Sequence, residues 1–458
     1  MKKVITKSIP QFSVFLVTLF FSHYLLLLFY DSSKGLDFGK YRRNLLFFSG
    51  QDINILDANG SIYFYLISKL NNNKLTSFNG ESGTMLNSVI QTSNFYFYVI
   101  GVLGLIVLFT YKKYKSEDIF IALSILNFFP TAIYLRLTMK PEILAFTLLP
   151  WTIYFLEKYL KSIKKIDLFF ASFLLSILIT LKASIMGMVM LSIFILFFKE
   201  IDNFRKLIKP IFLMSAFSLL NIYFNWKITG GWLFAKPTEA DLTLNSKWNF
   251  TADFNFFTNI DFKNLLENPY KHIHSDSFIS ITLLDTLSDY FHFFWNHKED
   301  SNYLAFDKIK FTNNFLIQEY SSQYISIVFT LLFYFITVIF CIKKVKNYKF
   351  LLLPFCGLFV LFLNSQGFPS KNFDPTTGDL FKVHYYSFLI SISFFVFLLI
   401  IYKSSNIWKT ISLLLIPIFL FVIGFPKNLS SETLLHLQTK CLESQFCKLI
   451  NIELFKLY

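Results

Sequence analysis

Charged side chains are scarce in this chain: Asp, Glu, Lys and Arg together make up 16% of its 458 residues. Soluble globular domains carry about 25%. Apolar residues, by contrast, make up 54% of the chain and aromatic residues 20%. A soluble domain has no interior large enough for so much apolar surface, so the composition excludes that class and favours a protein that lies in a membrane.

Cysteine is rare as well, with four residues in the whole chain. Cys341 and Cys356 fall in apolar stretches, where we expect them to pack as small apolar side chains. Cys441 and Cys447 lie near the C-terminus, and two interpretations stay open for them: a disulfide that closes a short loop, or two free thiols. The spacing of the four cysteines is not typical of a zinc site.

Long apolar runs dominate the remaining sequence. A helix needs about 20 residues to cross a bilayer. Eleven stretches approach or reach that length, which predicts an all-α polytopic membrane protein with about 11 transmembrane helices. The stretches are Gln11–Tyr30, Asn94–Tyr111, Asp118–Leu135, Glu142–Leu156, Ile166–Leu181, Ala183–Phe198, Ile208–Trp226, Tyr324–Ile342, Phe350–Leu363, Tyr385–Tyr402 and Thr410–Gly424.

The net charge of +14 does not indicate nucleic-acid binding, because the basic residues gather at alternate ends of the apolar stretches. By the positive-inside rule these ends face the cytoplasm. One group precedes the first stretch, and others follow the second, fourth, sixth, eighth and tenth: Lys2, Lys3 and Lys7; Lys112, Lys113 and Lys115; Lys158, Lys161, Lys164 and Lys165; Lys199, Arg205, Lys206 and Lys209; Lys343, Lys344, Lys346 and Lys349; Lys403 and Lys409.

This charge pattern predicts one orientation for the whole chain. Residues 1–424 are expected to form a single transmembrane domain in a bacterial inner (plasma) membrane, with the N-terminus in the cytoplasm. Loops at about 31–93, 227–323 and 364–384, together with a short tail at 425–458, then lie outside the cytoplasm. We expect amphipathic interfacial helices in these loops, with Asp57–Leu70 lying along the membrane, packed on the protein, or both.

Four polar elements fall on the predicted extracytoplasmic side. They are the loop around Asp37, the turn from Arg136 to Glu142, the turn at Lys182, and the segment from Asp374 to Tyr386. Ionisable groups at the ends of membrane spans are costly, which makes these elements functional candidates. The simpler alternatives are side chains that reach lipid headgroups, hairpin turns and solvated loop acids.

Several of these motifs resemble GT-C superfamily glycosyltransferases, the group related to protein O-mannosyltransferases and lipid A aminoarabinose transferases. The stretches that carry the resemblance are Asp37–Gly50 followed by Asp57–Ile67, Lys140-Pro141-Glu142, Lys182-Ala183-Ser184, and Lys382-Val383-His384-Tyr385-Tyr386. The chain differs from that group in having Phe38 after Asp37 instead of a second acid, and Ala183 instead of Tyr.

The resemblance implies an enzyme that moves a sugar from a polyprenyl-phosphate-linked donor to an extracytoplasmic acceptor: a lipid-linked glycan, lipid A or a protein. Such a transfer, expected to be inverting, needs a carboxylate base and cations that stabilise the departing phosphate. Asp37 is the candidate base. The candidate phosphate ligands are Arg136, Lys182, Lys382, His384 and Tyr385, and the candidate substrate-binding residues are Lys40, Tyr41, Asp57 and Glu142.

The reaction requires no particular cofactor. A divalent metal held by Asp37 and a second carboxylate would suit the chemistry, but the sequence does not demand one. His272, His274 and Asp276 are interpreted as a chance cluster in a polar loop rather than a metal site. Membrane lipids and the two substrates are the expected partners.

Three other functions compete with this hypothesis. An O-antigen polymerase or ligase usually relies on arginines in a large outer loop, and residues 227–323 contain none. A polysaccharide or lipid transporter would place ionisable groups near the middle of the bilayer, often in two related halves. The chain shows no internal repeat of this kind. A non-catalytic component of surface-polysaccharide assembly is the third alternative.

Overall fold

The computed structural model describes residues 9–29, 38–52, 60–71, 75, 83–198, 204–229, 254–267, 277–287, 313–367 and 383–423. Every regular element within these ranges is a helix. The helices are α2 (Ile9–Phe29), α3 (Phe38–Phe48), α4 (Ser61–Leu70), α6 (Gly83–Tyr111), α7 (Ser116–Leu126), α8 (Pro130–Leu137), α9 (Glu142–Ser162), α10 (Lys165–Leu181), α11 (Ala183–Phe197), α12 (Phe204–Thr229), α14 (Phe254–Thr258), α15 (Phe262–Glu267), α16 (Phe278–Asp285), α18 (Asn313–Ile342), η5 (Tyr348–Leu352), α19 (Leu353–Gly367), η7 (Val383–Tyr386), α20 (Ser387–Tyr402), α21 (Ile407–Leu413) and α22 (Leu415–Ile423).

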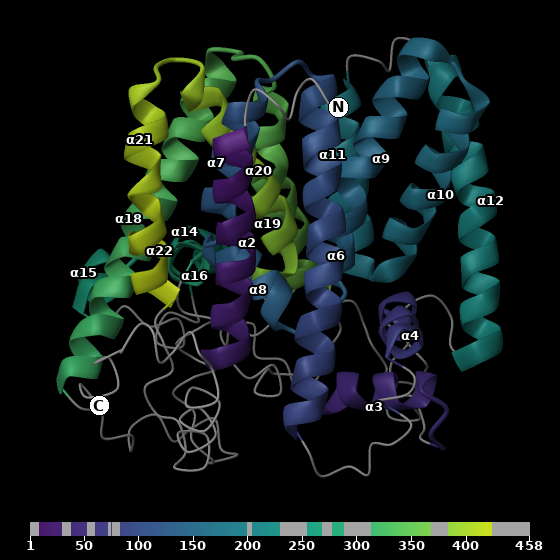
Figure 1. Ribbon diagram of the computed structural model, residues 1–458, viewed down its shortest axis with the longest axis horizontal. Coiled ribbons are helices and arrows are strands. Elements are labelled where there is room, and N and C mark those ends of the chain that lie inside the picture. The colour runs from purple at the N-terminus through teal and green to yellow at the C-terminus, as the bar shows by residue number, and fades with distance from the viewer. Residues whose placement is uncertain are drawn as a thin grey trace.

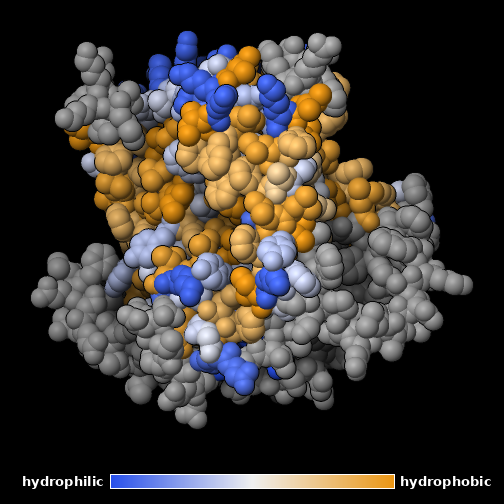
Figure 2. All heavy atoms as spheres, turned by 90° about the vertical axis from the view of Figure 1, so that its right-hand side faces the viewer, coloured by the Kyte–Doolittle hydropathy of each residue, from blue (hydrophilic) through white to orange (hydrophobic). Residues whose placement is uncertain are grey.

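Several of these helices are suited to a bilayer. In the described part of the chain, five segments are long and apolar enough to cross a membrane, in α2, α6, α12, α18 and η7–α20; the bent pair α7–α8 makes a sixth if it is one span. Figure 2 shows an apolar belt between two zones with polar side chains. These features are those of a polytopic helical membrane protein.

Each of the eleven predicted stretches overlaps a helix or a pair of helices, but several differ from the prediction in length or shape. Helices α6 and α18 begin 11 residues earlier than predicted, at Gly83 and Asn313. The stretch Asp118–Leu135 is broken into α7 and α8, which meet at 65°. Pro130 explains the break, because proline lacks an N–H donor and favours an extended residue before it, as observed at Phe129. Helix α9 is longer than predicted and continues to Ser162.

The centre of the bundle is formed by α6, α9 and α20 (Figure 1). Helix α9 packs against both α6 and α10, and α20 contacts α7, α8, α9 and α19. Small residues allow the closest approach: a Cβ atom on Gly101 of α6 would lie 2.7 Å from the Phe146 ring of α9, and one on Gly104 would lie 2.8 Å from the Trp151 indole. Glycine permits this contact between apolar helices, as it commonly does in membrane proteins.

Replacing Gly101 by Leu should therefore separate α6 from α9. Because the added side chain overlaps the Phe146 ring, we expect a loss of about 1–3 kcal/mol of stability, typical of an overpacked interior. Unfolding of the purified protein in mixed detergent micelles, followed by circular dichroism, measures the change. Leu103→Ala on the exposed face of the same helix is the control and should unfold nearly as the parent does.

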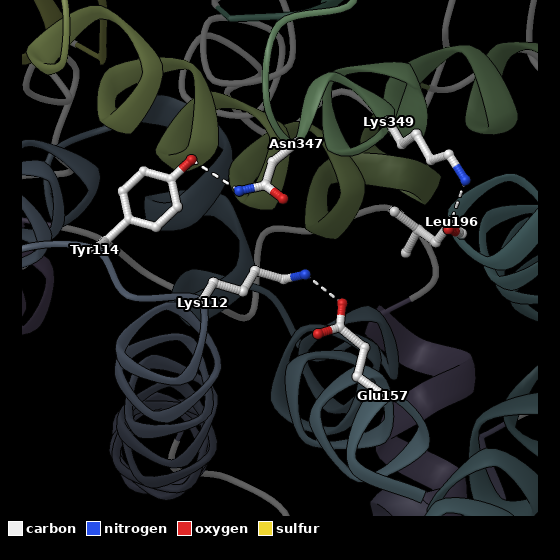
Figure 3. A network of polar contacts seen from close by, with 6 residues as sticks. All are labelled: Lys112, Tyr114, Glu157, Leu196, Asn347 and Lys349. Carbon is white, nitrogen blue, oxygen red and sulfur yellow. Dashed lines mark hydrogen bonds and ion pairs between the residues drawn. The ribbon is translucent and has the colours of Figure 1, made fainter. Parts of the chain in front are cut away.

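Basic side chains from distant parts of the chain meet at one end of the bundle, called here the lysine-rich end (Figure 3). Lys112, which follows α6, pairs with Glu157 of α9. The Asn347 amide donates to the Tyr114 hydroxyl at 2.8 Å, and the Lys403 ammonium lies 4.0 Å from the centre of that Tyr114 ring. Lys112 and Lys403, from the groups predicted after the second and tenth stretches, thus lie at the same end as residues next to the fourth and eighth groups.

The opposite end, called here the far end, carries the short helices α3 and α4 (Figure 1). Helix α4 confirms the helix predicted within Asp57–Leu70, and it packs on the protein through Tyr63, Phe64 and Ile67. Its N-cap, Gly60, has a φ of 72° and donates its N–H to the Leu181 carbonyl at 2.8 Å. This bond ties α4 to the end of α10, where the candidate site begins.

Candidate functional site

Two turns and one short helix bring the candidate site together. Lys140 precedes α9 in the turn from α8, and Glu142 opens α9. Lys182 separates α10 from α11 in an extended conformation with φ −165° and ψ 146°. His384 and Tyr385 belong to η7, which leads into α20. Together these five residues are named the site cluster.

Lys182 and Glu142 form the first pair in the site cluster. The Lys182 ammonium lies 2.9 Å from Glu142 Oε1, and the two side chains are 13% and 1% exposed. Burial lowers the pKa of Lys182, but Glu142, with smaller contributions from Tyr41 and Tyr385, more than offsets it, so the net pKa is raised. Lys182 therefore keeps its positive charge at neutral pH.

Glu142 retains one carboxylate oxygen for another donor. Its Oε1 accepts from Lys182, while its buried Oε2 has no hydrogen-bond partner among the described residues. A buried acceptor without a donor costs about 1–3 kcal/mol. A ligand hydroxyl or ammonium bound at this oxygen would remove that cost.

Lys140 and His384 form the second pair. The Lys140 ammonium lies 2.9 Å from His384 Nε2, and both residues are buried. Tyr385 joins the two pairs, because its ring centre lies 3.9 Å from the Lys182 ammonium and 5.6 Å from that of Lys140. With Lys182, Lys140 and Glu142 charged, the site cluster carries a net charge of about +1.

A hydrogen-bonded frame holds the turn that carries Lys140. The Tyr63 hydroxyl donates to Asn94 Oδ1 at 2.8 Å, and the Asn94 amide donates to the Thr138 carbonyl at 2.8 Å. Burial raises the pKa of Tyr63 well above its usual value, although the bond to Asn94 partly offsets the effect, so the hydroxyl stays protonated. Helices α4 and α6 thus position the start of α9.

Tyr63→Phe should loosen this frame without changing the shape of the side chain. The substitution removes the donor to Asn94 Oδ1, and a buried acceptor left unpaired costs about 1–3 kcal/mol. We expect a lower thermal unfolding midpoint in detergent, measured by tryptophan fluorescence. Tyr65→Phe is the matched control, because Tyr65 lies on the same helix but is 42% exposed; an equal loss in both variants would contradict the role given to Tyr63.

Arg136 lies inside the bundle and is not a member of the site cluster. Its Nη1 donates to Ser22 Oγ at 2.8 Å, Nη2 donates to the Asn127 carbonyl, and Nε donates to a carbonyl one turn earlier in α8. The guanidinium carbon lies 4.6 Å from the centre of the Tyr98 ring. Since these contacts are all within the protein, Arg136 joins α8 to α2 and α6, and its position lends no support to the predicted role in phosphate binding.

Five predicted site residues come close to one another: Tyr41, Glu142, Lys182, His384 and Tyr385. The predicted Asp37, Asp57 and Lys382, and the side chain of Lys40, lie outside the described residues. So do Cys441, Cys447 and the cluster of His272, His274 and Asp276. Cys341 and Cys356 are free thiols, and Cys356 is buried as predicted.

Lys140 and Asn94 are the residues of this site that sequence reasoning undervalued or missed. Lys140 shares its turn with Arg136, which was predicted as the phosphate ligand because a planar guanidinium suits phosphate. Asn94 was taken only as the start of an apolar stretch. A signal was available for Asn94, because an amide inside a long apolar helix needs buried partners.

Neither the family models, nor the curated proteins, nor the solved structures compared with this chain give a match. In the described ranges, no three His, Cys, Asp or Glu side chains are placed to hold a metal ion together. The functional assignment therefore depends on the chemistry of the site cluster itself.

Proposed function

We propose that the protein is a GT-C-like membrane glycosyltransferase with about eleven transmembrane helices. It would transfer a sugar from a polyprenyl-phosphate-linked donor to an extracytoplasmic lipid-linked glycan, lipid A or protein. The observation that carries the proposal is the site cluster: Lys140, which is buried, and Lys182, which is 13% exposed, meet a histidine and a tyrosine beside one carboxylate at the far end.

The cluster has the charge that a phosphate leaving group requires. As the bond from the sugar to the phosphate breaks, negative charge builds on the phosphate oxygens, and cations already in place stabilise it most effectively. Lys140 and Lys182 lie near the same Tyr385 ring, so one phosphate placed beside that ring would interact with both. Burial strengthens this interaction because water does not screen it.

The proposed orientation would give the enzyme an active site outside the cytoplasm. The predicted cytoplasmic lysines gather at the lysine-rich end, and the site cluster lies at the far end. With the N-terminus in the cytoplasm of a bacterial inner membrane, the site cluster would face the extracytoplasmic surface. A lipid-linked donor would present its phosphate at that depth.

A groove beside α4 suits the apolar chain of such a donor. It has a volume of about 280 Å³ and is lined by residues of α3, α4 and α12: Phe48, Ser61, Ile62, Tyr65, Asn221, Phe224, Asn225 and Ile228. Most of its lining is apolar. Helix α4 thus has the groove on one side, while Tyr63 on its buried side borders the site cluster.

Two carboxylates complete the proposed chemistry. Asp37, which lies between α2 and α3 in the sequence, would accept the proton of the attacking hydroxyl or amine as general base. Glu142 would accept a hydrogen bond from a substrate hydroxyl at Oε2 while it holds Lys182 through Oε1.

The direct test uses purified protein in liposomes with radiolabelled polyprenyl-phosphate sugars and a membrane extract as the source of acceptor. Transfer of label, with release of polyprenyl phosphate in equal amount, is the expected result. Movement of the intact lipid across the bilayer without release of the sugar would instead indicate a transporter and overturn the proposal.

A further inference from the structure

Three connections between helices meet around Tyr114 at the lysine-rich end. Tyr114 follows α6, and Asn347, in the turn after α18, donates its side-chain amide to the Tyr114 hydroxyl at 2.8 Å (Figure 3). Lys403, which follows α20, places its ammonium 4.0 Å from the centre of the Tyr114 ring. Because Tyr114 is buried, it gives the turn after α18 and the end of α20 a fixed point of contact.

The turn after α18 brings a second lysine to this place. Lys346 is exposed and directly precedes Asn347. Lys344 and Asn347 lie in the left-handed region, with φ values of 47° and 66°, so the turn has a sharply defined backbone. The Lys346 charge is close enough to act on Lys403: the pKa of Lys403 is lowered, first by burial and then by Lys346, while Asp118 opposes the effect.

These lysines lack enough negative charge to balance them. Asp118 pairs with Lys409 at 2.6 Å. Neither Lys346 nor Lys403 has a carboxylate within salt-bridge distance among the residues that the structure describes. Three ammonium groups thus share one carboxylate, which leaves two positive charges. Like charges held close together repel, so an anion bound between Lys346 and Lys403 would stabilise both.

The surface beside the lysines is apolar. Helix α18 ends four residues before Lys346 and packs against α22, which follows α21. Trp408, at the start of α21, is 44% exposed, and tryptophans at membrane interfaces typically lie at the level of the lipid headgroups. Other exposed apolar side chains on α18 and α21 extend this surface: Leu331, Phe335, Val338, Ile342, Ile407 and Ile411.

We propose that this surface binds an anionic phospholipid of the membrane. The lipid phosphate would lie between the Lys346 and Lys403 ammonium groups, and the acyl chains would lie on the exposed apolar side chains of α18 and α21. The two features together require a ligand that is both anionic and amphiphilic, whereas soluble phosphate would use the lysines alone. Basic surfaces between transmembrane helices are suited to such headgroups. The site lies at the opposite end of the bundle from the site cluster and does not depend on the proposed function.

Quenching of Trp408 fluorescence by lipids brominated on their acyl chains locates the bound lipid. Because the chain has six tryptophans, the Trp408 signal is taken as the difference between the parent protein and Trp408→Phe. The full-length protein in a neutral detergent is titrated with brominated phosphatidylglycerol, and we expect strong quenching. Brominated phosphatidylcholine has similar chains but no net charge and should quench weakly. Equal quenching by the two lipids would overturn the proposal.

Lys346→Gln/Lys403→Gln tests the two lysines. Each lysine near an anionic headgroup contributes about fivefold in affinity, so the double variant should bind phosphatidylglycerol about 25-fold more weakly. Lys164→Gln/Lys165→Gln is the matched control, because it removes the same charge from an exposed pair between α9 and α10 at the same end. Its binding curve should equal that of the parent. An equal loss in both double variants would indicate attraction by net charge alone and contradict the site.

Inorganic phosphate distinguishes the two sources of a phosphate group. Added at constant ionic strength, it should leave the bound lipid in place, and displacement of the lipid would identify soluble phosphate as the ligand instead. Lys346→Gln alone is the second variant if the double variant does not fold, since this exposed side chain lies in a turn. It should weaken lipid binding about fivefold, and an unchanged affinity would reject the proposed contact.

Discussion

Lys182→Met is expected to reduce sugar transfer by about 10²–10³-fold. In the proposed reaction the Lys182 ammonium stabilises the charge that develops on the phosphate, and groups of this kind typically contribute that much. The raised pKa of Lys182 means that the parent protein carries this charge throughout the neutral range. The rate of release of polyprenyl phosphate from a labelled donor in liposomes measures the loss.

The same substitution also has a structural effect that must be separated from the chemical one. Removing Lys182 leaves the Glu142 carboxylate buried without its cation, and breaking a buried pair in this way typically costs about 3–5 kcal/mol. The double variant Lys182→Met/Glu142→Gln removes both charges and should recover much of the stability. If transfer recovers with it, Lys182 acts only by pairing with Glu142, and its role toward phosphate is wrong.

Asp37→Asn is expected to reduce transfer at least as strongly, by about 10²–10⁴-fold, because an amide cannot accept the proton of the attacking group. The variant keeps the size of the side chain. The affinity for the lipid donor, measured separately by equilibrium binding in detergent, should change little. The substitution is expected to lower the rate of sugar transfer instead. Asp52, an exposed carboxylate 15 residues later in the sequence, provides the control substitution Asp52→Asn.

Transfer by Asp37→Asn at the rate of the parent protein would remove Asp37 from the proposed reaction. The site cluster would then have to supply the base, and the buried Oε2 of Glu142 is the carboxylate oxygen in the described residues best placed to do so. Glu142→Gln would distinguish the two cases, because it should be inactive only if Glu142 takes the proton.

Much of the helical fold could be predicted from the sequence because long apolar runs are local signals. The ends of those runs also predicted part of the site: Glu142, Lys182 and His384 each lie where an apolar stretch begins or ends. Alternate ends of successive spans meet on the same side of a bundle, so these residues come together although they are far apart in the chain.

The sequence could not show which of Lys140 and Arg136 faces the site and which faces the interior of the bundle. They are four residues apart, and their positions depend on the break before Pro130 and on the extended Thr138 that ends α8. That geometry turns Arg136 into the bundle and leaves Lys140 beside His384. The contact of Asp285 with the Val383 N–H was missed because the two residues are 98 positions apart in sequence, and only the packing of α16 brings them together.

The central claim is that the site cluster binds the phosphate of a lipid-linked donor. An experimental structure of the protein with a non-hydrolysable polyprenyl-phosphonate sugar tests it most directly. The account predicts the phosphonate oxygens within hydrogen-bond distance of the Lys140 and Lys182 ammonium groups, with the polyprenyl chain in the groove beside α4. A phosphonate bound elsewhere, with the Lys182–Glu142 and Lys140–His384 pairs unchanged, would contradict it.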